Sequence, residues 1–187
     1  KNYISSSSSI YQKSSFVSGT QDKGSQLYAA TMSIMDENGE LINNLQIDVG
    51  TSSSFQNNVF FDNASYSSGY YTDGQRFPLL CKINLNGTFA KALKLTGITE
   101  STESTIIAVT SNNTLLLPGS TGTFVEMYPN STLKFAKKYS SPSSFWFTSV
   151  VETNTHDYIL AGRMVGSPTR GVLLKTTNQG ELIWAKE

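Results

Sequence analysis

The stretch that decides the fold is DYILAGRMVGSPTRGVLLKTTNQGELIWAKE, residues 157–187. It contains an apolar run that ends at Gly162, a second apolar run, a turn at Gly180 and a third run that contains Trp184. Short β-branched and aromatic runs that are separated by Gly, Asn and Pro are typical of β-strands. Together with the preceding run FTSVVET, residues 147–153, this stretch predicts a module of four strands.

The landmarks of this module recur along the chain. The turn recurs at spacings of 48, 44 and 49 residues, at Gly39, Gly87, Ser131 and Gly180. The Gly that ends the earlier run recurs at spacings of 50, 50 and 43 residues, at Gly19, Gly69, Gly119 and Gly162. Four-stranded modules with a period of about 40–50 residues indicate β-propeller blades. A sandwich or a solenoid is the alternative, but an ordinary sandwich has no such period.

We therefore expect an all-β chain with about four four-stranded blades. It is interpreted as a single β-propeller or propeller segment over residues 1–187, with modules at 1–48, 49–97, 98–141 and 142–187. Propellers of this type more often have six to eight blades. Further blades outside this sequence, or another copy of the chain, are therefore expected to cover the open edge. The sequence starts with Lys1 rather than Met, which predicts a removed leader or a longer parent protein.

The register of apolar residues supports the repeat. Two positions are apolar in every module: one lies seven residues before the turn landmark, at Met32, Leu80, Phe124 and Leu173, and the other two residues after it, at Leu41, Phe89, Leu133 and Leu182. The position five residues before the landmark is mostly polar, at Ile34, Lys82, Glu126 and Lys175. We expect the apolar positions to face a core and the polar one to face outward. Asn38-Gly39 and Asn86-Gly87 predict tight type I′ hairpin turns.

The last module resembles a known type of repeat. The matching residues are Tyr158, Ile159, Ala161, Gly162, Leu174, Lys175, Thr176, Gly180, Trp184 and Lys186. They resemble the GYIxAG…LLKTxxxGxxxWAK pattern of large secreted or cell-surface β-propellers from bacteria and protists. The other three modules match more loosely. The resemblance implies a scaffold at a cell surface, without a shared active site.

The composition limits the classes of partner. Lys+Arg and Asp+Glu are both 14, so the formal net charge is zero and offers no general attraction to nucleic acid or anionic membrane. We interpret the basic cluster Lys134, Lys137 and Lys138 as a solvated strand face. The single cysteine, Cys81, lies in an apolar run and is expected to be a small buried side chain. The Ser5–Ser9 run is of low complexity and is expected to be flexible.

Motifs for catalysis or metal binding are weak. His156 is the only histidine, and we expect it in a turn, with its neighbour Asp157 pointing elsewhere. The acidic stretch DENGE, residues 36–40, faintly resembles a calcium loop but lacks a distal Glu. Glu100 and Glu103 are interpreted as part of a polar loop between blades. We therefore predict no catalytic residue, no metal site and no cofactor.

Four sequences have the form Asn-Xaa-Ser/Thr. Their asparagines, Asn63, Asn86, Asn112 and Asn130, are candidate glycosylation sites. The number is no excess over chance in a chain so rich in Asn, Ser and Thr. Asn86 and Asn130 fall at the same expected turn of two modules, and Asn112 falls at another turn, so exposed backbone is expected there.

These patterns predict a non-enzymatic extracellular or cell-surface scaffold, or a subunit of a larger filament or matrix. Its expected partners are further copies of itself or other surface proteins, without nucleic acid or a membrane span. A carbohydrate- or protein-binding propeller module is the alternative, in which exposed rings among Tyr70, Tyr71, Phe145 and Trp146 stack on sugars. A propeller hydrolase is the less favoured third reading, because the sequence shows no cluster of acids and His.

Overall fold

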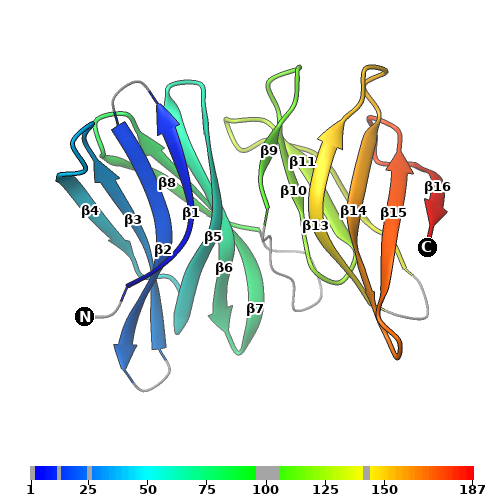
Figure 1. Ribbon diagram of the computed structural model, residues 1–187, viewed down its shortest axis with the longest axis horizontal. Coiled ribbons are helices and arrows are strands. Elements are labelled where there is room, and N and C mark those ends of the chain that lie inside the picture. The colour runs from blue at the N-terminus through cyan, green and yellow to red at the C-terminus, as the bar shows by residue number, and fades with distance from the viewer. Residues whose placement is uncertain (1–2, 12–13, 25–26, 96–105, 141–143) are drawn as a thin grey trace. The chain divides into compact units, whose positions relative to one another are not determined.

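The structure is a computed structural model that describes residues 3–11, 14–24, 27–95, 106–140 and 144–187. The chain divides into two compact units, Lys1–Ser104 and Thr105–Glu187. Each unit contains two four-stranded antiparallel sheets, whose strands lie side by side in chain order (Figure 1). The predicted all-β architecture with four four-stranded blades is confirmed.

The first unit holds the β1–β4 and β5–β8 sheets. Their strands are β1 (Tyr3–Tyr11), β2 (Ser14–Gly24), β3 (Leu27–Met35), β4 (Leu41–Ile47), β5 (Ser52–Phe61), β6 (Ala64–Asp73), β7 (Gln75–Asn84) and β8 (Phe89–Lys94). The Ser5–Ser9 run is part of β1 and pairs with β2, so the expectation of flexibility was wrong. A serine run can enter a sheet because the backbone, not the side chain, supplies the pairing hydrogen bonds.

The second unit holds the β9–β12 and β13–β16 sheets. Their strands are β9 (Ala108–Val109), β10 (Leu115–Pro118), β11 (Thr123–Met127), β12 (Leu133–Lys138), β13 (Ser144–Glu152), β14 (Tyr158–Val165), β15 (Arg170–Thr176) and β16 (Leu182–Lys186). None of the described residues forms a helix that is long and apolar enough to cross a membrane.

One turn geometry closes hairpins in both units. In the turn Asp36–Glu40, Asp36 N donates to Glu40 O at 2.9 Å and Gly39 N donates to Asp36 O at 3.1 Å. The same pair of bonds closes the turns that start at Asn84, Thr110, Tyr128, Thr153 and Thr177. The fourth turn residue always has a positive φ, at Gly39, Gly87, Asn113, Ser131, His156 and Gly180. This is the three-residue hairpin loop with a left-handed residue at its end.

The predicted hairpins at Asn38-Gly39 and Asn86-Gly87 are therefore present, but the predicted turn type was wrong. A type I′ turn needs two consecutive residues with positive φ, and here only the Gly of each pair has one. Two consecutive positive φ values, 49° and 52°, occur instead at Asp62 and Asn63 in the two-residue loop between β5 and β6.

Bulges recur at the same register. Between the third and fourth strands of every sheet, one residue of the fourth strand is skipped: Ile42, Ala90, Lys134 or Ile183. A second bulge lies in β1, β5 and β13, directly beside Gly19, Gly69 and Gly162 of the neighbouring strands. A Cβ on Gly69 would lie 1.9 Å from Ser54 O, and one on Gly162 would lie 2.1 Å from Trp146 O. The repeated Gly is thus required by the close approach of the bulged strand.

The expected facing of the register positions was partly wrong. Met32, Leu80 and Phe124 are buried as expected, but Leu173 is 43% exposed. The mostly polar position, five residues before the turn landmark, was expected to face outward. Residues two apart on a strand share a face, so it faces the same side as the apolar position, and Ile34 and Glu126 are as buried as Met32 and Phe124. Leu41, Phe89, Leu133 and Leu182, expected to face a core, are all about half-exposed, at 61%, 49%, 54% and 52%.

Each unit has its own hydrophobic core between its two sheets. In the first unit, Phe16, Met32 and Ile34 of the β1–β4 sheet pack against Leu79 and Cys81 of the β5–β8 sheet. In the second unit, Leu116 and Phe124 of the β9–β12 sheet pack against Tyr158, Leu160 and Leu174 of the β13–β16 sheet. The expectation that Cys81 is a small buried side chain is confirmed.

Candidate functional site

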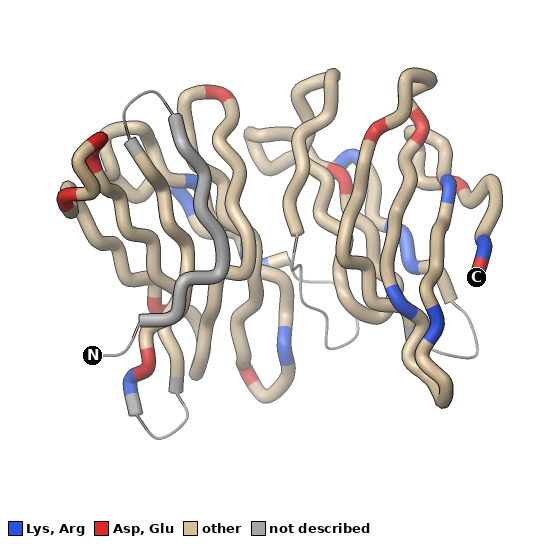
Figure 2. The backbone as a smooth tube through the Cα atoms, in the orientation of Figure 1, with Lys and Arg blue, Asp and Glu red and all other residues tan. Residues whose placement is uncertain are grey.

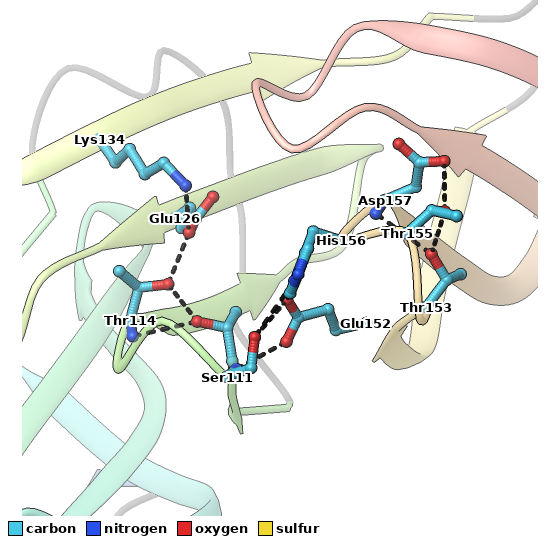
Figure 3. A network of polar contacts seen from close by, with 10 residues as sticks. Ser111, Thr114, Glu126, Lys134, Glu152, Thr153, Thr155, His156 and Asp157 are labelled. Atoms are coloured by element: carbon cyan, nitrogen blue, oxygen red, sulfur yellow. Dashed lines mark hydrogen bonds and ion pairs between the residues drawn. The ribbon is translucent and has the colours of Figure 1, made fainter.

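The densest polar network in the described residues lies where the β9–β12 sheet meets the β13–β16 sheet (Figure 3). Two of the shared turns, Thr110–Thr114 and Thr153–Asp157, bring its side chains together. The hydroxyls of Thr110 and Thr153 accept bonds from the backbone N–H groups of Thr114 and Asp157 and hold the turns closed. Elsewhere, charged residues are few and both signs are scattered along the chain (Figure 2).

Ser111, Glu152 and His156 form the exposed part of this network. Ser111 N donates to Glu152 Oε2 at 2.6 Å, and Ser111 Oγ donates to Glu152 Oε1 at 2.8 Å. His156 Nδ1 lies 2.7 Å from Glu152 Oε1 and 3.2 Å from Ser111 Oγ. His156 is in a turn, as expected, but it joins two sheets rather than standing alone. Asp157 points elsewhere and pairs with Lys175 at 2.9 Å.

The Glu152 carboxylate is stabilised in its charged form. Partial burial raises its pKa, but bonds from the Ser111 backbone, His156 and the Ser111 hydroxyl outweigh burial and hold the pKa below the ordinary carboxyl value. The charged carboxylate therefore favours the contact between the two turns.

This cluster does not have the geometry of a hydrolytic triad. A triad places the nucleophile on one ring nitrogen of the histidine and the acid on the other. Here Ser111 Oγ and Glu152 Oε1 both approach Nδ1, and the serine hydroxyl is bonded to the carboxylate directly. The arrangement therefore suits a structural contact between two turns, not activation of Ser111. Ser111, Glu152 and His156 are hereafter called the clasp.

A buried charge lies beside the clasp. Glu126 of β11 is fully buried, and its Oε1 accepts bonds from Thr114 Oγ1 at 2.5 Å and Lys134 Nζ at 2.8 Å. Tyr158 packs close by: burial raises the pKa of its phenol, and the Glu126 carboxylate raises it further. Since a buried carboxylate requires compensation, Lys134 and Thr114 are structural partners of Glu126.

The basic cluster was interpreted as a solvated strand face, and that reading was wrong for Lys134, whose partner is a fully buried carboxylate. Lys134 neutralises Glu126, and Lys137 Nζ lies 2.6 Å from Glu181 Oε1 in the turn of the following sheet. Lys134 reaches the adjacent strand of its own sheet and Lys137 reaches the following sheet, and an isolated strand pattern reveals neither contact.

The junctions within the two units are built at the same register. In the second unit, Gly180 packs on Phe135 and Lys137 of β12, and Tyr139 Oη donates to Gly180 O at 2.8 Å. In the first unit, Gly87 packs on Asn43 of β4, whose Nδ2 donates to Gly87 O at 3.0 Å. Asn43 and Phe135 are the same register position, each just after the bulge.

The turn that faintly resembled a calcium loop is held by its own backbone. Asp36 Oδ1 accepts bonds from Asn38 N and Glu40 N, both at 2.8 Å. These bonds lower the pKa of Asp36, the Glu40 bond first. No group of three His, Cys, Asp or Glu that could hold a metal ion occurs in the described ranges. Glu100 and Glu103 lie outside the described residues.

The four aromatic residues considered for sugar stacking lie in different environments. Tyr71 and Phe145 are buried in the cores. Tyr70 and Trp146 are more accessible, but Arg76 lies 4.5 Å from the ring centre of Tyr70 and Arg163 lies 4.8 Å from that of Trp146. Each guanidinium group therefore occupies one face of its ring, where it would compete with a stacked sugar.

The four candidate glycosylation sites, Asn63, Asn86, Asn112 and Asn130, all lie in exposed turns. Asn86 Oδ1 accepts bonds from the backbone and hydroxyl of Thr88, and Asn130 Oδ1 accepts one from Thr132 N.

The sequence analysis assigned one set of repeated apolar residues to the core, but the structure places them at the surface. Leu41, Phe89, Leu133 and Leu182, hereafter the rim residues, stand at one register position at the start of each fourth strand. They remain about half-exposed even though every sheet packs on a neighbour within its unit. The sequence signal was present, since the position is apolar in all modules, but it was assigned to the core.

The cross-sheet contacts also carry a signal that sequence reasoning did not use. The pairs Ser111–His156, Lys137–Glu181 and Asn43–Gly87 are 45, 44 and 44 residues apart, which is one repeat. Complementary side chains one repeat apart can thus be read as candidates for contacts between consecutive blades.

Comparison with known proteins identifies the fold. No family model and no curated protein sequence matches this chain. A protein of unknown function from Bacteroides caccae is similar in structure, with a TM-score of 0.58 and 11% identity over 99% of this chain and 82% of that one. BamB from Moraxella catarrhalis is also similar, with a TM-score of 0.63 and 11% identity over 96% of this chain and 48% of that one. BamB is a β-propeller protein, and the four sheets of this chain are propeller blades.

Proposed function

We propose that this chain is a non-enzymatic scaffold of the extracellular space or cell surface, which contacts other proteins through its outer strands. The observation that carries the proposal is the set of rim residues, exposed at one register position in all four sheets. Apolar groups repeated at one register position, in a neutral chain rich in hydroxyl groups, suit contacts with protein partners.

The polar network supports the same proposal. Ser111 bonds to Glu152 and contacts His156 across the sheet junction, so the chemistry of these residues is used to hold two blades together. The repeat resemblance of residues 158–186 to secreted and cell-surface propellers adds the location, and the exposed sequon turns at Asn63, Asn86, Asn112 and Asn130 are compatible with glycosylation there.

The test uses protein secreted from eukaryotic cells and labelled with a fluorophore. We expect saturable binding to the surface of intact, non-permeabilised source cells, and loss of about 90% of it when all four rim residues are changed to Ser. Lys138→Ser, an exposed change on β12, is the control variant and should bind normally. Equal binding by parent and rim variant, or detection of the native chain only after permeabilisation, would contradict the proposal.

A further inference from the structure

One sheet face stands out because its equivalents elsewhere are covered. The free face of the β13–β16 sheet carries Val151, Ile159, Leu173 and Trp184. Val151 is 56% and Leu173 is 43% exposed, whereas Ile159 and Trp184 are half-buried. At the register position of Leu173, Met32 and Phe124 are fully buried by the next sheet of their own unit. The free face therefore has the layout of a face that receives a following blade.

The complementary half of such a junction is open in the β1–β4 sheet. Gly87 and Gly180 each pack on the fourth strand of the preceding sheet, and a Cβ on either would meet side chains at 2.9 or 2.8 Å. Gly39 is their counterpart in the first sheet, and a Cβ there would meet nothing within 4 Å. The turn around Gly39 thus lacks a sheet to pack on.

The charges at the two open ends match. In the second unit, Lys137 of the receiving sheet pairs with Glu181, the residue after the turn glycine. Lys186 stands at the register position of Lys137, because each pairs with the equivalent residue of the third strand, Leu173 or Phe124. Glu40, exposed directly after Gly39, stands at the position of Glu181. The β13–β16 sheet therefore carries the lysine of such a pair, Lys186, and the β1–β4 sheet carries the glutamate, Glu40.

We propose that two copies of this chain associate head to tail. The free face of the β13–β16 sheet in each copy packs on the β1–β4 sheet of the other, and Lys186 pairs with Glu40 of the second copy. Two equivalent junctions then close the pair of copies into a ring.

The junction is expected to be weaker than those inside the units. In each unit, the second sheet packs on the first through residues of its third strand, Cys81 and Ile83 in β7 or Leu174 and Thr176 in β15. At the same register positions, the β1–β4 sheet has half-buried Ser33 and Met35. A less apolar surface buries less area that favours association, so the dimer should dissociate on dilution. The inference goes beyond the proposed function, because it concerns the free face rather than the rim residues.

The test is the oligomeric state of the purified full chain, measured by sedimentation velocity over about 1–100 μM. We expect a monomer–dimer equilibrium for the parent. Leu173→Lys should raise the dissociation constant about 100-fold, because it places a charge in the junction. Leu182→Lys is the matched control: Leu182 lies in the same sheet, is 52% exposed and belongs to the rim residues, so dimerisation should be unchanged.

A charge exchange tests the orientation. Lys186→Glu and Glu40→Lys should each weaken the dimer about tenfold, and the two changes combined should restore it to within about threefold of the parent. A parent that stays monomeric, a dimer that Leu173→Lys leaves intact, or an open series of larger oligomers would each overturn the ring. Because Leu173→Lys leaves the rim residues in place, its cell-surface binding separates failure of the ring from failure of the proposed function.

Discussion

Lys137 of β12 and Glu181 of the β15–β16 turn lie 2.6 Å apart, and they are separated by 44 residues, one repeat of the chain. The bond from Asn43 to Gly87 spans the same 44 residues and joins the equivalent strand to the equivalent turn. An ion pair and an amide bond thus join the same strand and the same turn in two junctions, at register positions one or two residues apart. What repeats is the geometry of blade on blade, and the chemistry at the contact varies.

The repeated glycines should be intolerant of a side chain. Gly69→Ala and Gly162→Ala place a Cβ about 2 Å from a backbone oxygen, so each is expected to destabilise its unit by about 3 kcal/mol. Gly171→Ala is the control, since a Cβ there meets nothing within 4 Å. Urea unfolding would measure the difference, and equal stability of all three variants would show that the bulged strands do not approach as described.

The buried pair Glu126–Lys134 should show strong coupling. Lys134→Met removes the ammonium group that neutralises the buried carboxylate and is expected to cost about 3 kcal/mol. The double variant Glu126→Leu/Lys134→Met removes both charges and should recover most of that loss. A double-mutant cycle from urea unfolding measures the coupling; additive effects of the two changes would contradict the pairing.

Acid should loosen the clasp between the two turns of the second unit. The folded-state pKa of Glu152 is below its ordinary value of 4.5, so the carboxylate stabilises the fold above pH 4.5, and that contribution is lost as the pH falls through the lowered value. Glu152→Gln should therefore flatten the decrease in melting temperature below pH 4.5. Parallel curves for parent and variant would exclude this role.

Cys81 should be unreactive in the folded protein. Burial raises the pKa of its thiol to about 12, so almost no thiolate exists at pH 8. Labelling by a thiol reagent at pH 8 is expected only after unfolding in urea, as followed by mass spectrometry. Rapid labelling of the native chain would show that the core around Cys81 is open.

Much of the fold could be predicted from the sequence because turns and bulges restrict which residue type can occupy individual positions. Gly39, Gly87 and Gly180 are favoured by the positive φ of their turn position, and Gly69 and Gly162 are required by close approach, so all of them keep the period visible. The strands of the last module were predicted at nearly their observed positions for the same reason.

The facing of residues could not be predicted as well. Leu133 and Glu126 show why: the apolar residue is exposed at the rim, and the charged one is fully buried, where Lys134 and Thr114 bond to its Oε1. Inner strands of stacked sheets are covered on both faces, so alternation of polar and apolar residues is lost there. The clasp of Ser111, Glu152 and His156 depends on how one sheet lies on the next, which no single strand encodes.

The account depends most on four equivalent blades whose last free face is completed by a second copy of the chain. An engineered crosslink tests this directly: the variant Glu40→Cys/Lys186→Cys, with Cys81→Ser to remove the native thiol, is oxidised at low concentration and run on a non-reducing gel. The account predicts a covalent dimer of twice 20.4 kDa, and no dimer when only one of the two new cysteines is present. A product that stays at 20.4 kDa, or a ladder of longer chains, would contradict it.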